Sequence, residues 1–105
     1  MRGFGNEKIV RKAKKVILKA LIYLTKKNDN NAYFSAPAIL HNIPFKFSSH
    51  NKIYPNDITK ILEEYMPTGL VEKASIITSC GKTGTFGYAA NRSKMKRLES
   101  YLRNL

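Results

Sequence analysis

The tripeptide Gly81-Lys82-Thr83 is the segment of this 105-residue sequence that comes nearest to a nucleotide-binding motif. A phosphate-binding P-loop also needs a glycine five positions before its Gly-Lys pair, so that backbone N–H groups can surround the phosphates. Position 76 is instead an isoleucine in a strand-like run, and the tripeptide is followed by a second strand-like run rather than a helix. The sequence therefore does not predict nucleotide binding at this loop.

Other residue types that carry out catalysis are few and scattered. The two histidines, His41 and His50, and the single Cys80 do not make up a zinc-binding set. A thiol dyad of Cys80 with a distant histidine lacks any recognisable oxyanion donor. Glu63 and Glu64 are adjacent in a predicted helix and so point in different directions. We therefore expect a protein that is not an enzyme and that uses no cofactor and no metal.

The charge of the sequence indicates which class of partner the protein binds. The sequence holds 19 Lys and Arg residues against seven Asp and Glu, which gives a formal net charge of +12. A field of that sign attracts polyanions by counterion release and steers their approach. It favours a nucleic acid partner over the two alternatives, an anionic membrane and a basic protein with no polyanionic partner.

Length and composition indicate one cytoplasmic, intracellular domain over residues 1–105. A chain of this size has room for one modest core. No apolar run approaches the roughly 20 residues of a membrane-spanning helix, and the N-terminus lacks the pattern of a signal peptide. The lone Cys80 cannot form an internal disulfide, which favours a reducing compartment. The Lys-, Asn- and Ile-rich composition is typical of AT-rich genomes, archaeal and viral ones among them.

The first predicted element is an amphipathic helix that begins at Lys8, after a loose basic arm over residues 1–6. Its apolar residues recur at steps of three and four: Ile9, Ala13, Val16, Ile17, Ala20, Leu21 and Leu24. Its other faces carry basic residues: Lys8, Arg11, Lys12, Lys15, Lys19 and Lys26. The polar run at residues 28–31 ends the helix, since Asn and Asp tolerate turn conformations.

The remaining elements are shorter. Tyr33-Phe34 is strand-like, and Ser35 is the N-cap expected for a short helix that ends near Asn42. Residues 45–54 read as a long connection with room for one helical turn. A helix follows over residues 56–66, with Ile58, Ile61, Leu62 and Tyr65 on its buried side. Two strands, at residues 70–77 and 86–90, enclose a glycine-containing basic loop at 78–85, and a final helix starts near Arg92.

The order of three helices, a hairpin and a closing helix resembles the winged helix-turn-helix superfamily. The residues that carry the resemblance are Ile58-Thr59-Lys60-Ile61-Leu62 and then Gly69-Leu70-Val71-Glu72-Lys73, which are similar to that superfamily's junction between recognition helix and strand. The resemblance covers roughly residues 8–90. The sequence departs from the pattern in its long connection at 45–54 and in Met66-Pro67-Thr68, which replaces a charged helix end.

The resemblance implies an α+β winged helix-turn-helix fold with three helices, a two- or three-stranded antiparallel wing sheet and a C-terminal helix. It implies binding to double-stranded DNA as a transcriptional regulator, with the helix at 56–66 in the major groove and the wing at 78–85 on the backbone. The expected base contacts are Asn56, Asp57, Thr59, Lys60 and Glu63. The expected backbone contacts are Ser48, Ser49, His50, Lys52, Lys82, Thr83, Lys12 and Lys15.

Two other functions stay open at this point, because one fold serves many functions. The first is an RNA-binding or ribosome-associated winged helix, and the second is a protein-interaction module that shares the fold. In the C-terminal segment at 92–105, Met95, Leu98, Leu102 and Leu105 are spaced to pack on the first helix or on a second copy of the chain. Dimeric winged-helix proteins often pair through terminal helices, so we expect a homodimer.

Overall fold

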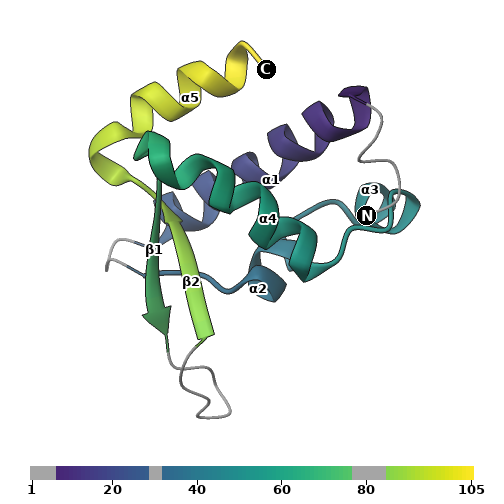
Figure 1. The fold of residues 1–105 in the computed structure, drawn as a ribbon, viewed down its shortest axis with the longest axis horizontal. Coiled ribbons are helices and arrows are strands. Elements are labelled where there is room, and N and C mark those ends of the chain that lie inside the picture. The colour runs from purple at the N-terminus through teal and green to yellow at the C-terminus, as the bar shows by residue number, and fades with distance from the viewer. Residues whose placement is uncertain (1–6, 29–31, 77–84) are drawn as a thin grey trace.

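The computed structural model describes residues 7–28, 32–76 and 85–105, which form an α+β arrangement (Figure 1). The described residues contain five α-helices and a two-stranded antiparallel sheet. In chain order the elements are α1 (Glu7–Lys27), α2 (Ala36–His41), α3 (Phe45–His50), α4 (Pro55–Tyr65), the 3-10 turn η1 (Met66–Thr68), β1 (Val71–Ile76), β2 (Thr85–Ala90), the 3-10 turn η2 (Arg92–Lys94) and α5 (Met95–Arg103). This order is compatible with a winged-helix layout, with one short helix, α3, added before α4.

Helix α1 buries four of the seven apolar residues in its predicted stripe, whereas Ile9, Val16 and Leu24 are only half-buried. Ala13, Ile17 and Leu21 are fully buried, and so are Leu18 and Thr25, which the spacing had not included. The hydroxyl of Thr25 donates to the Leu21 carbonyl (2.8 Å) and accepts the N–H of Ala90 (3.0 Å). This buried hydroxyl therefore joins α1 to the end of β2.

Ser35 caps α2 as predicted. Its backbone is extended, and its hydroxyl accepts the N–H of Ala38 at 3.4 Å. Ile39 and Ile43 are buried, and α2 packs against α4. The short helix α2 thus supports the longer helix α4.

Residues 45–54 hold a six-residue helix, α3, where the sequence predicted a long connection with room for one helical turn. The helix ends in a Schellman motif, in which the N–H of Ile53 donates to the Ser48 carbonyl (2.9 Å) and that of Lys52 to the Ser49 carbonyl (3.3 Å). Lys52 holds the left-handed position of this motif, with a φ of 52°, and Ile53 is buried behind it.

Helix α4 begins at Pro55 and buries Ile58, Ile61, Leu62 and Tyr65, as predicted. The turn η1 extends it by three residues and stops at Gly69, which has a φ of 76°. Glycine adopts this left-handed conformation without the steric clash of a Cβ. The chain can therefore reverse sharply from α4 into β1.

Strands β1 and β2 pair in antiparallel register from Val71–Ala90 to Ile76–Thr85. Phe34 exchanges two backbone hydrogen bonds of 2.8 Å with Tyr88, which confirms the strand-like prediction for that residue as a single bridge. β2 therefore lies between β1 and the segment before α2. The predicted wing loop, 78–85, lies outside the described residues except for Thr85, which belongs to β2.

Helix α5 packs on α1 through Leu98 and Leu102, which are buried. Tyr101 meets Tyr65 of α4 edge to face, and their hydroxyl oxygens are 2.9 Å apart. Of the two roles predicted for this helix, packing on the first helix is therefore present within one chain. No helix in the described part of the chain is both long enough and apolar enough to cross a membrane.

Candidate nucleic-acid interface

The N-terminal half of α4 presents a polar edge to solvent. Asn56 and Lys60 are exposed, and Thr59 is half-buried between them and the hairpin. Residues three and four apart lie on one face of a helix, so the three side chains form one contiguous edge. An amide, a hydroxyl and an ammonium are groups that can bond to base edges in a DNA groove.

Asp57, a predicted base contact, does not belong to this edge. Its side chain is 5% exposed, and its carboxylate accepts the backbone N–H of Tyr54 at 2.8 Å. This is the capping position of an acidic residue in the first turn, where it satisfies an otherwise unpaired N–H. The prediction for Asp57 is therefore corrected: the residue fixes the start of α4 rather than facing a partner.

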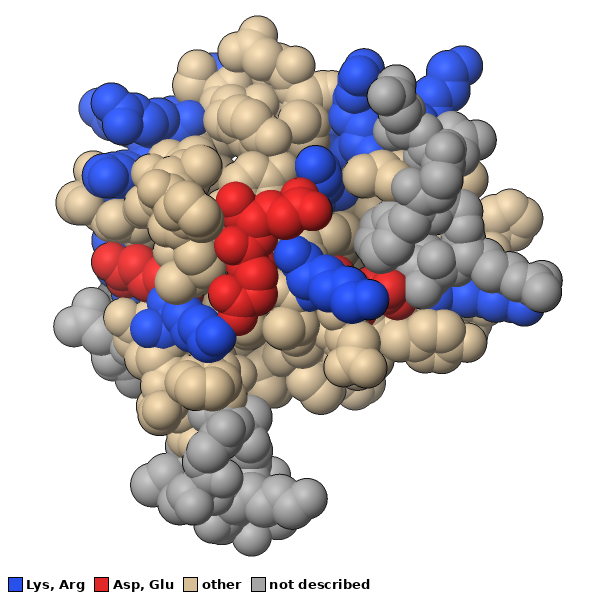
Figure 2. Space-filling view, viewed as in Figure 1, with Lys and Arg blue, Asp and Glu red and all other residues tan. Residues whose placement is uncertain are grey.

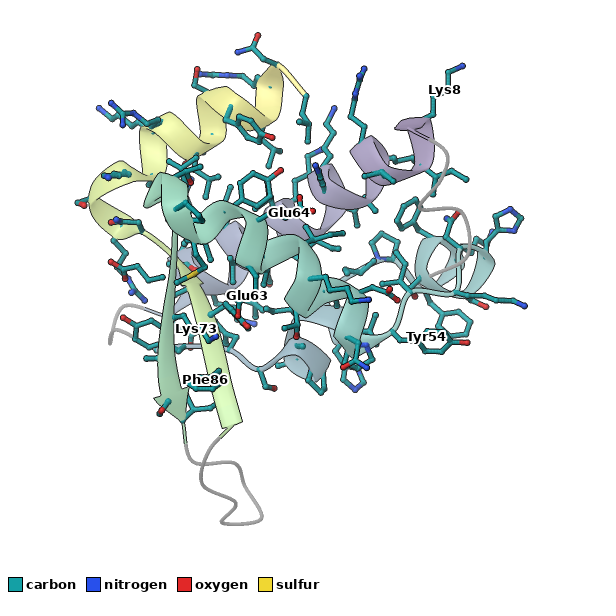
Figure 3. The ribbon with its side chains drawn as sticks, viewed as in Figure 1. Lys8, Tyr54, Glu63, Glu64, Lys73 and Phe86 are labelled. Atoms are coloured by element: carbon teal, nitrogen blue, oxygen red, sulfur yellow. The ribbon has the colours of Figure 1, made fainter. Side chains whose placement is uncertain are left out.

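Glu63, another predicted base contact, is engaged by the hairpin. Its Oε1 accepts the ammonium of Lys73 at 2.6 Å and the hydroxyl of Tyr88 at 2.9 Å (Figure 3). These two hydrogen bonds hold the pKa of Glu63 below its ordinary value. Burial, together with the same carboxylate, raises the pKa of Tyr88 to about 12. Glu63 therefore ties α4 to both strands, and the base contact expected of it stays a prediction.

Glu64 also has a basic partner, since it lies 3.3 Å from the ammonium of Lys14 on α1. The surface over α4 therefore carries Lys14, Lys60 and Lys73 against Glu63 and Glu64. Figure 2 shows acidic side chains gathered over the middle of α4 with basic side chains beside them. This face is nearly neutral, so the large positive charge of the chain lies elsewhere.

The predicted backbone contacts of the 45–54 segment divide between two sides of α3. Ser48, Ser49 and Lys52 line a depression of about 670 Å³ that reaches the start of α4. The Ser48 hydroxyl donates to the Phe45 carbonyl at 3.2 Å, whereas Ser49 and Lys52 are exposed. His50 lines a separate groove toward α1. Only the first three are therefore placed to act together with α4.

Lys12 and Lys15 lie on α1, away from the edge of α4. Successive residues of an α-helix are about 100° apart around its axis, so Lys12 points almost opposite to Lys14, which reaches α4. Lys12 instead lies over the ring of Phe47 on α3, with 5.6 Å between its ammonium and the ring centroid. The sequence predicted a single interface for these lysines and α4, and the fold separates them.

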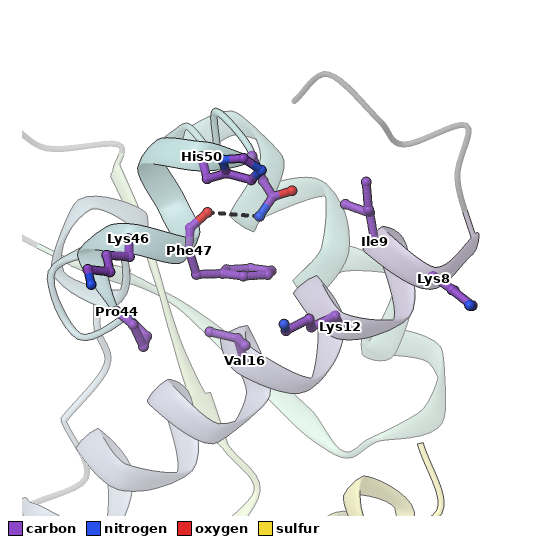
Figure 4. A pocket seen from close by; sticks show the side chains of 9 residues that line it. Lys8, Ile9, Lys12, Val16, Pro44, Lys46, Phe47 and His50 are labelled. Carbon is purple, nitrogen blue, oxygen red and sulfur yellow. Dashed lines mark hydrogen bonds between the residues drawn. The ribbon is translucent and has the colours of Figure 1, made fainter.

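Basic side chains gather on this other side of α1. A shallow depression of about 460 Å³ is lined by five of them. We call them the α1 basic surface: Lys8, Arg11, Lys12, Lys15 and Lys19. Lys8 and Lys12 also border the groove of about 630 Å³ between α1 and α3, where Phe47 and Val16 form apolar walls (Figure 4). The basic region therefore extends from α1 to Lys46 and His50 of α3.

Two predicted backbone contacts, Lys82 and Thr83, lie outside the described residues, as does Cys80. Among the described residues no group of three His, Cys, Asp or Glu side chains is arranged to hold a metal ion. Phe45 and Tyr54, which no sequence pattern had selected, are the most exposed large apolar side chains described, at 81% and 58%. The sequence signal that could have selected these two rings is their position at the two ends of the largely polar segment 45–54.

Comparison with models of known protein families finds no match, and comparison with curated proteins finds no similar sequence. A proposal of function therefore depends on the residues and geometry of this chain alone.

Proposed function

We propose that this protein is a winged helix-turn-helix protein that binds double-stranded DNA and regulates transcription, with α4 in the major groove. The observation that carries the proposal is the polar edge of α4, where Asn56 and Lys60 are exposed and Thr59 is half-buried beside them. Helix α2 packs against α4, and a left-handed glycine joins η1, which extends α4, to the hairpin. A supported helix beside a hairpin is the geometry with which winged helices meet a groove.

Each side chain of the edge has a base partner of matching chemistry. The amide of Asn56 can bond adenine at two atoms, and the ammonium of Lys60 can reach guanine or a phosphate. The methyl group of Thr59 can contact the methyl group of thymine. Glu63 and Glu64 do not oppose this approach strongly, because a lysine lies within 3.3 Å of each.

Backbone contacts come from groups near the N-terminal end of α4 and from the wing. Ser49 and Lys52 lie beside that end, where hydroxyl and ammonium groups can fix the register on phosphates. Lys82 and Thr83 remain proposed wing contacts. Lys12, Lys15 and His50 lie on another side of the domain, so we assign them to attraction of the polyanion and neutralisation of its phosphates outside the α4 contact.

Selection of binding sites from random duplex DNA, followed by fluorescence anisotropy on the selected site, tests the proposal. Asn56→Ala and Lys60→Ala should each weaken binding to the selected site by about 1–3 kcal/mol and relax its preference at one position. Lys26→Ala is the matched control, because Lys26 lies near the C-terminal end of α1 and is ion-paired with Glu99 of α5. If both α4 variants keep the sequence preference of the wild type, the proposal that α4 binds in the major groove is contradicted.

An RNA-binding winged helix is the second candidate, and exposed Phe45 and Tyr54 are the observation that favours it. RNA recognition commonly stacks unpaired bases on aromatic side chains. Competition between duplex DNA and a structured RNA at fixed salt separates the two candidates. Binding to neither nucleic acid at low salt would favour the third candidate, a protein-interaction module.

A homodimer through α5 remains part of the proposal. Leu98 and Leu102 already pack inside one chain, and Tyr101 meets Tyr65 of α4. A second copy would therefore have to use the remaining side of α5, where Lys96, Arg97 and Arg103 are exposed. Sedimentation velocity over a range of concentrations measures this directly. A protein that stays monomeric at every concentration would contradict the homodimer. Its DNA site would then need no two-fold symmetry.

A further inference from the structure

Two aromatic rings flank the start of α4 without being part of the core. Phe45, the first residue of α3, is 81% exposed, and Tyr54, the last residue before α4, is 58% exposed. Figure 3 shows Tyr54 projecting outward at the N-terminal end of α4. Rings left in water forgo the favourable free energy of burial, so their joint exposure calls for a physical explanation.

Both rings line the same depression between α2 and α3, which has a volume of about 670 Å³. Its floor is apolar and is formed by Leu40, Ile43 and Ile53, of which the last two are buried. Binding sites for small organic groups have this character, with volumes of about 300–1,000 Å³ and largely apolar walls. The depression can therefore receive a flat, partly apolar group between or against the two rings.

Polar groups stand at the rim of this depression. Lys52, His41 and Ser49 are exposed there. A cation at the rim matches a phosphate, and hydroxyl and imidazole groups can hydrogen-bond to the edge of a nucleobase. The depression thus has an apolar floor, aromatic sides and a basic rim. This combination matches a nucleotide better than it matches a purely apolar ligand.

The backbone around the depression is held in a fixed conformation. Lys52 adopts a left-handed φ of 52°, which is unfavourable for a residue with a Cβ. The two hydrogen bonds of the Schellman motif hold it there, and the buried side chain of Ile53 anchors the turn. This turn sets Lys52 and Tyr54 on the rim, immediately before Asn56 of the proposed reading edge.

We propose that this depression holds an unpaired nucleobase, stacked on Phe45 and Tyr54, next to the duplex read by α4. The inference rests on the proposed nucleic-acid binding and specifies its substrate: a duplex with a bulged or otherwise extruded nucleotide. It also gives the 45–54 segment a role, since α3 supplies one ring and the α3–α4 turn supplies the other.

The test compares a blunt duplex containing the selected site with the same duplex carrying one unpaired 2-aminopurine at its edge. Anisotropy measures affinity, and 2-aminopurine fluorescence reports stacking. The wild-type protein should bind the bulged duplex more tightly by about 5-fold to 100-fold, the range expected from stacking one base on an aromatic side chain. Binding should quench the fluorescence.

Phe45→Ala should abolish this preference and the quenching while leaving affinity for the blunt duplex unchanged. Phe45→Tyr should restore both, and circular dichroism should show the same fold for all variants. Tyr23→Ala is the matched control, because Tyr23 is a similarly exposed ring (53%) on α1, away from the depression. It should change neither readout.

Equal affinity of the wild type for blunt and bulged duplexes would overturn the inference and leave duplex binding intact. Equal weakening of both duplexes by Phe45→Ala would also overturn it, since the ring would then contact paired DNA. Absence of all nucleic-acid binding would overturn both proposals. Phe45-dependent binding of single strands alone would contradict the duplex proposal and support the base-stacking site.

Discussion

The carboxylate of Glu63, in the last turns of α4, lies 2.6 Å from the ammonium of Lys73 on β1. Lys73 also lies over the ring of Phe86 on β2, 4.3 Å from its centroid, and the hydroxyl of Tyr88 donates to the same Glu63 oxygen. Helix and hairpin are thus joined by one cluster of four side chains. This cluster links the proposed reading helix to the hairpin.

The Glu63 cluster should make stability depend on acid pH. The pKa of Glu63 is lowered in the folded state, mainly by its hydrogen bond from Lys73. Its stabilisation is therefore present above the ordinary value of 4.5 and is lost as pH falls through the lowered pKa. Glu63→Gln keeps the oxygen acceptor but not the charge.

We expect Glu63→Gln to lower the unfolding free energy near neutral pH by about 0.5–1.5 kcal/mol, a modest value because solvent screens a partly exposed pair. The difference from wild type should shrink in thermal melts as pH falls through the lowered pKa of Glu63. Glu99→Gln, which breaks the exposed pair with Lys26, is the control. A constant difference at every pH would show that the charge of Glu63 does not contribute.

Gly69, at the corner between η1 and β1, should tolerate substitution poorly. Its φ of 76° is costly for any residue with a Cβ, and an added Cβ would lie 2.7 Å from the flexible Lys94 ammonium. Because that side chain can move, the backbone conformation dominates the cost. Gly69→Ala should therefore destabilise the fold by about 1–2 kcal/mol and lower the melting temperature by about 4–16 °C.

Gly69→Asn provides the comparison, since asparagine enters the left-handed region more readily than alanine does. It should lose clearly less stability than Gly69→Ala. If the two variants have the same melting temperature, steric contact rather than backbone conformation determines the cost of substituting Gly69.

The elements that depend on local pattern were predictable from the sequence. α1, α4 and α5 show apolar spacing of three and four, and Ser35 and Pro55 mark helix starts. Helix α3 was not predictable in full. It is short, it contains Ser48 and Ser49, and its left-handed end is a lysine where a glycine would have signalled a helix C-terminus.

The candidate site was predictable in its residue types but not in its grouping. An aspartate in the first turn of a helix suits a base contact or a cap equally, and only the 2.8 Å bond to the Tyr54 N–H decides for Asp57. A lysine pattern likewise shows that a surface is basic without showing which side of the domain it faces. Lys12 and Lys60 were grouped by charge, and the packing of α1 separates them.

Lys52 should be a position where a single substitution stabilises the fold. It occupies the left-handed C′ position of α3, which glycine fills at lower steric cost. Part of that gain is offset because glycine adds entropy to the unfolded chain. Lys52→Gly should therefore raise the unfolding free energy by about 0.5–1 kcal/mol.

Chemical denaturation measures this gain, and Lys46→Gly, at an exposed helical position of the same α3, should instead destabilise. Lys52→Gly should also weaken DNA binding, because it removes a proposed phosphate contact. A variant that is less stable than wild type would contradict the left-handed assignment of Lys52.

The α1 basic surface should control the salt dependence of the proposed DNA binding more than the sequence preference of that binding. Lys12, Lys15 and Lys19 line one depression and point away from the side that reaches α4. Changing all three to glutamine should reduce the slope of log affinity against log salt, by up to about 0.9 for each phosphate that the variant no longer neutralises. The selected sequence should not change.

The matched control removes the same charge from another region, by changing Lys94, Lys96 and Arg97 around η2 and α5 to glutamine. Anisotropy titrations from low to physiological salt give both slopes. A smaller slope for the α1 variant alone assigns ion release to that surface. Equal reductions in both variants would mean that total charge, rather than the α1 basic surface, attracts the DNA, and Lys12 and Lys15 would then have no specific role in binding.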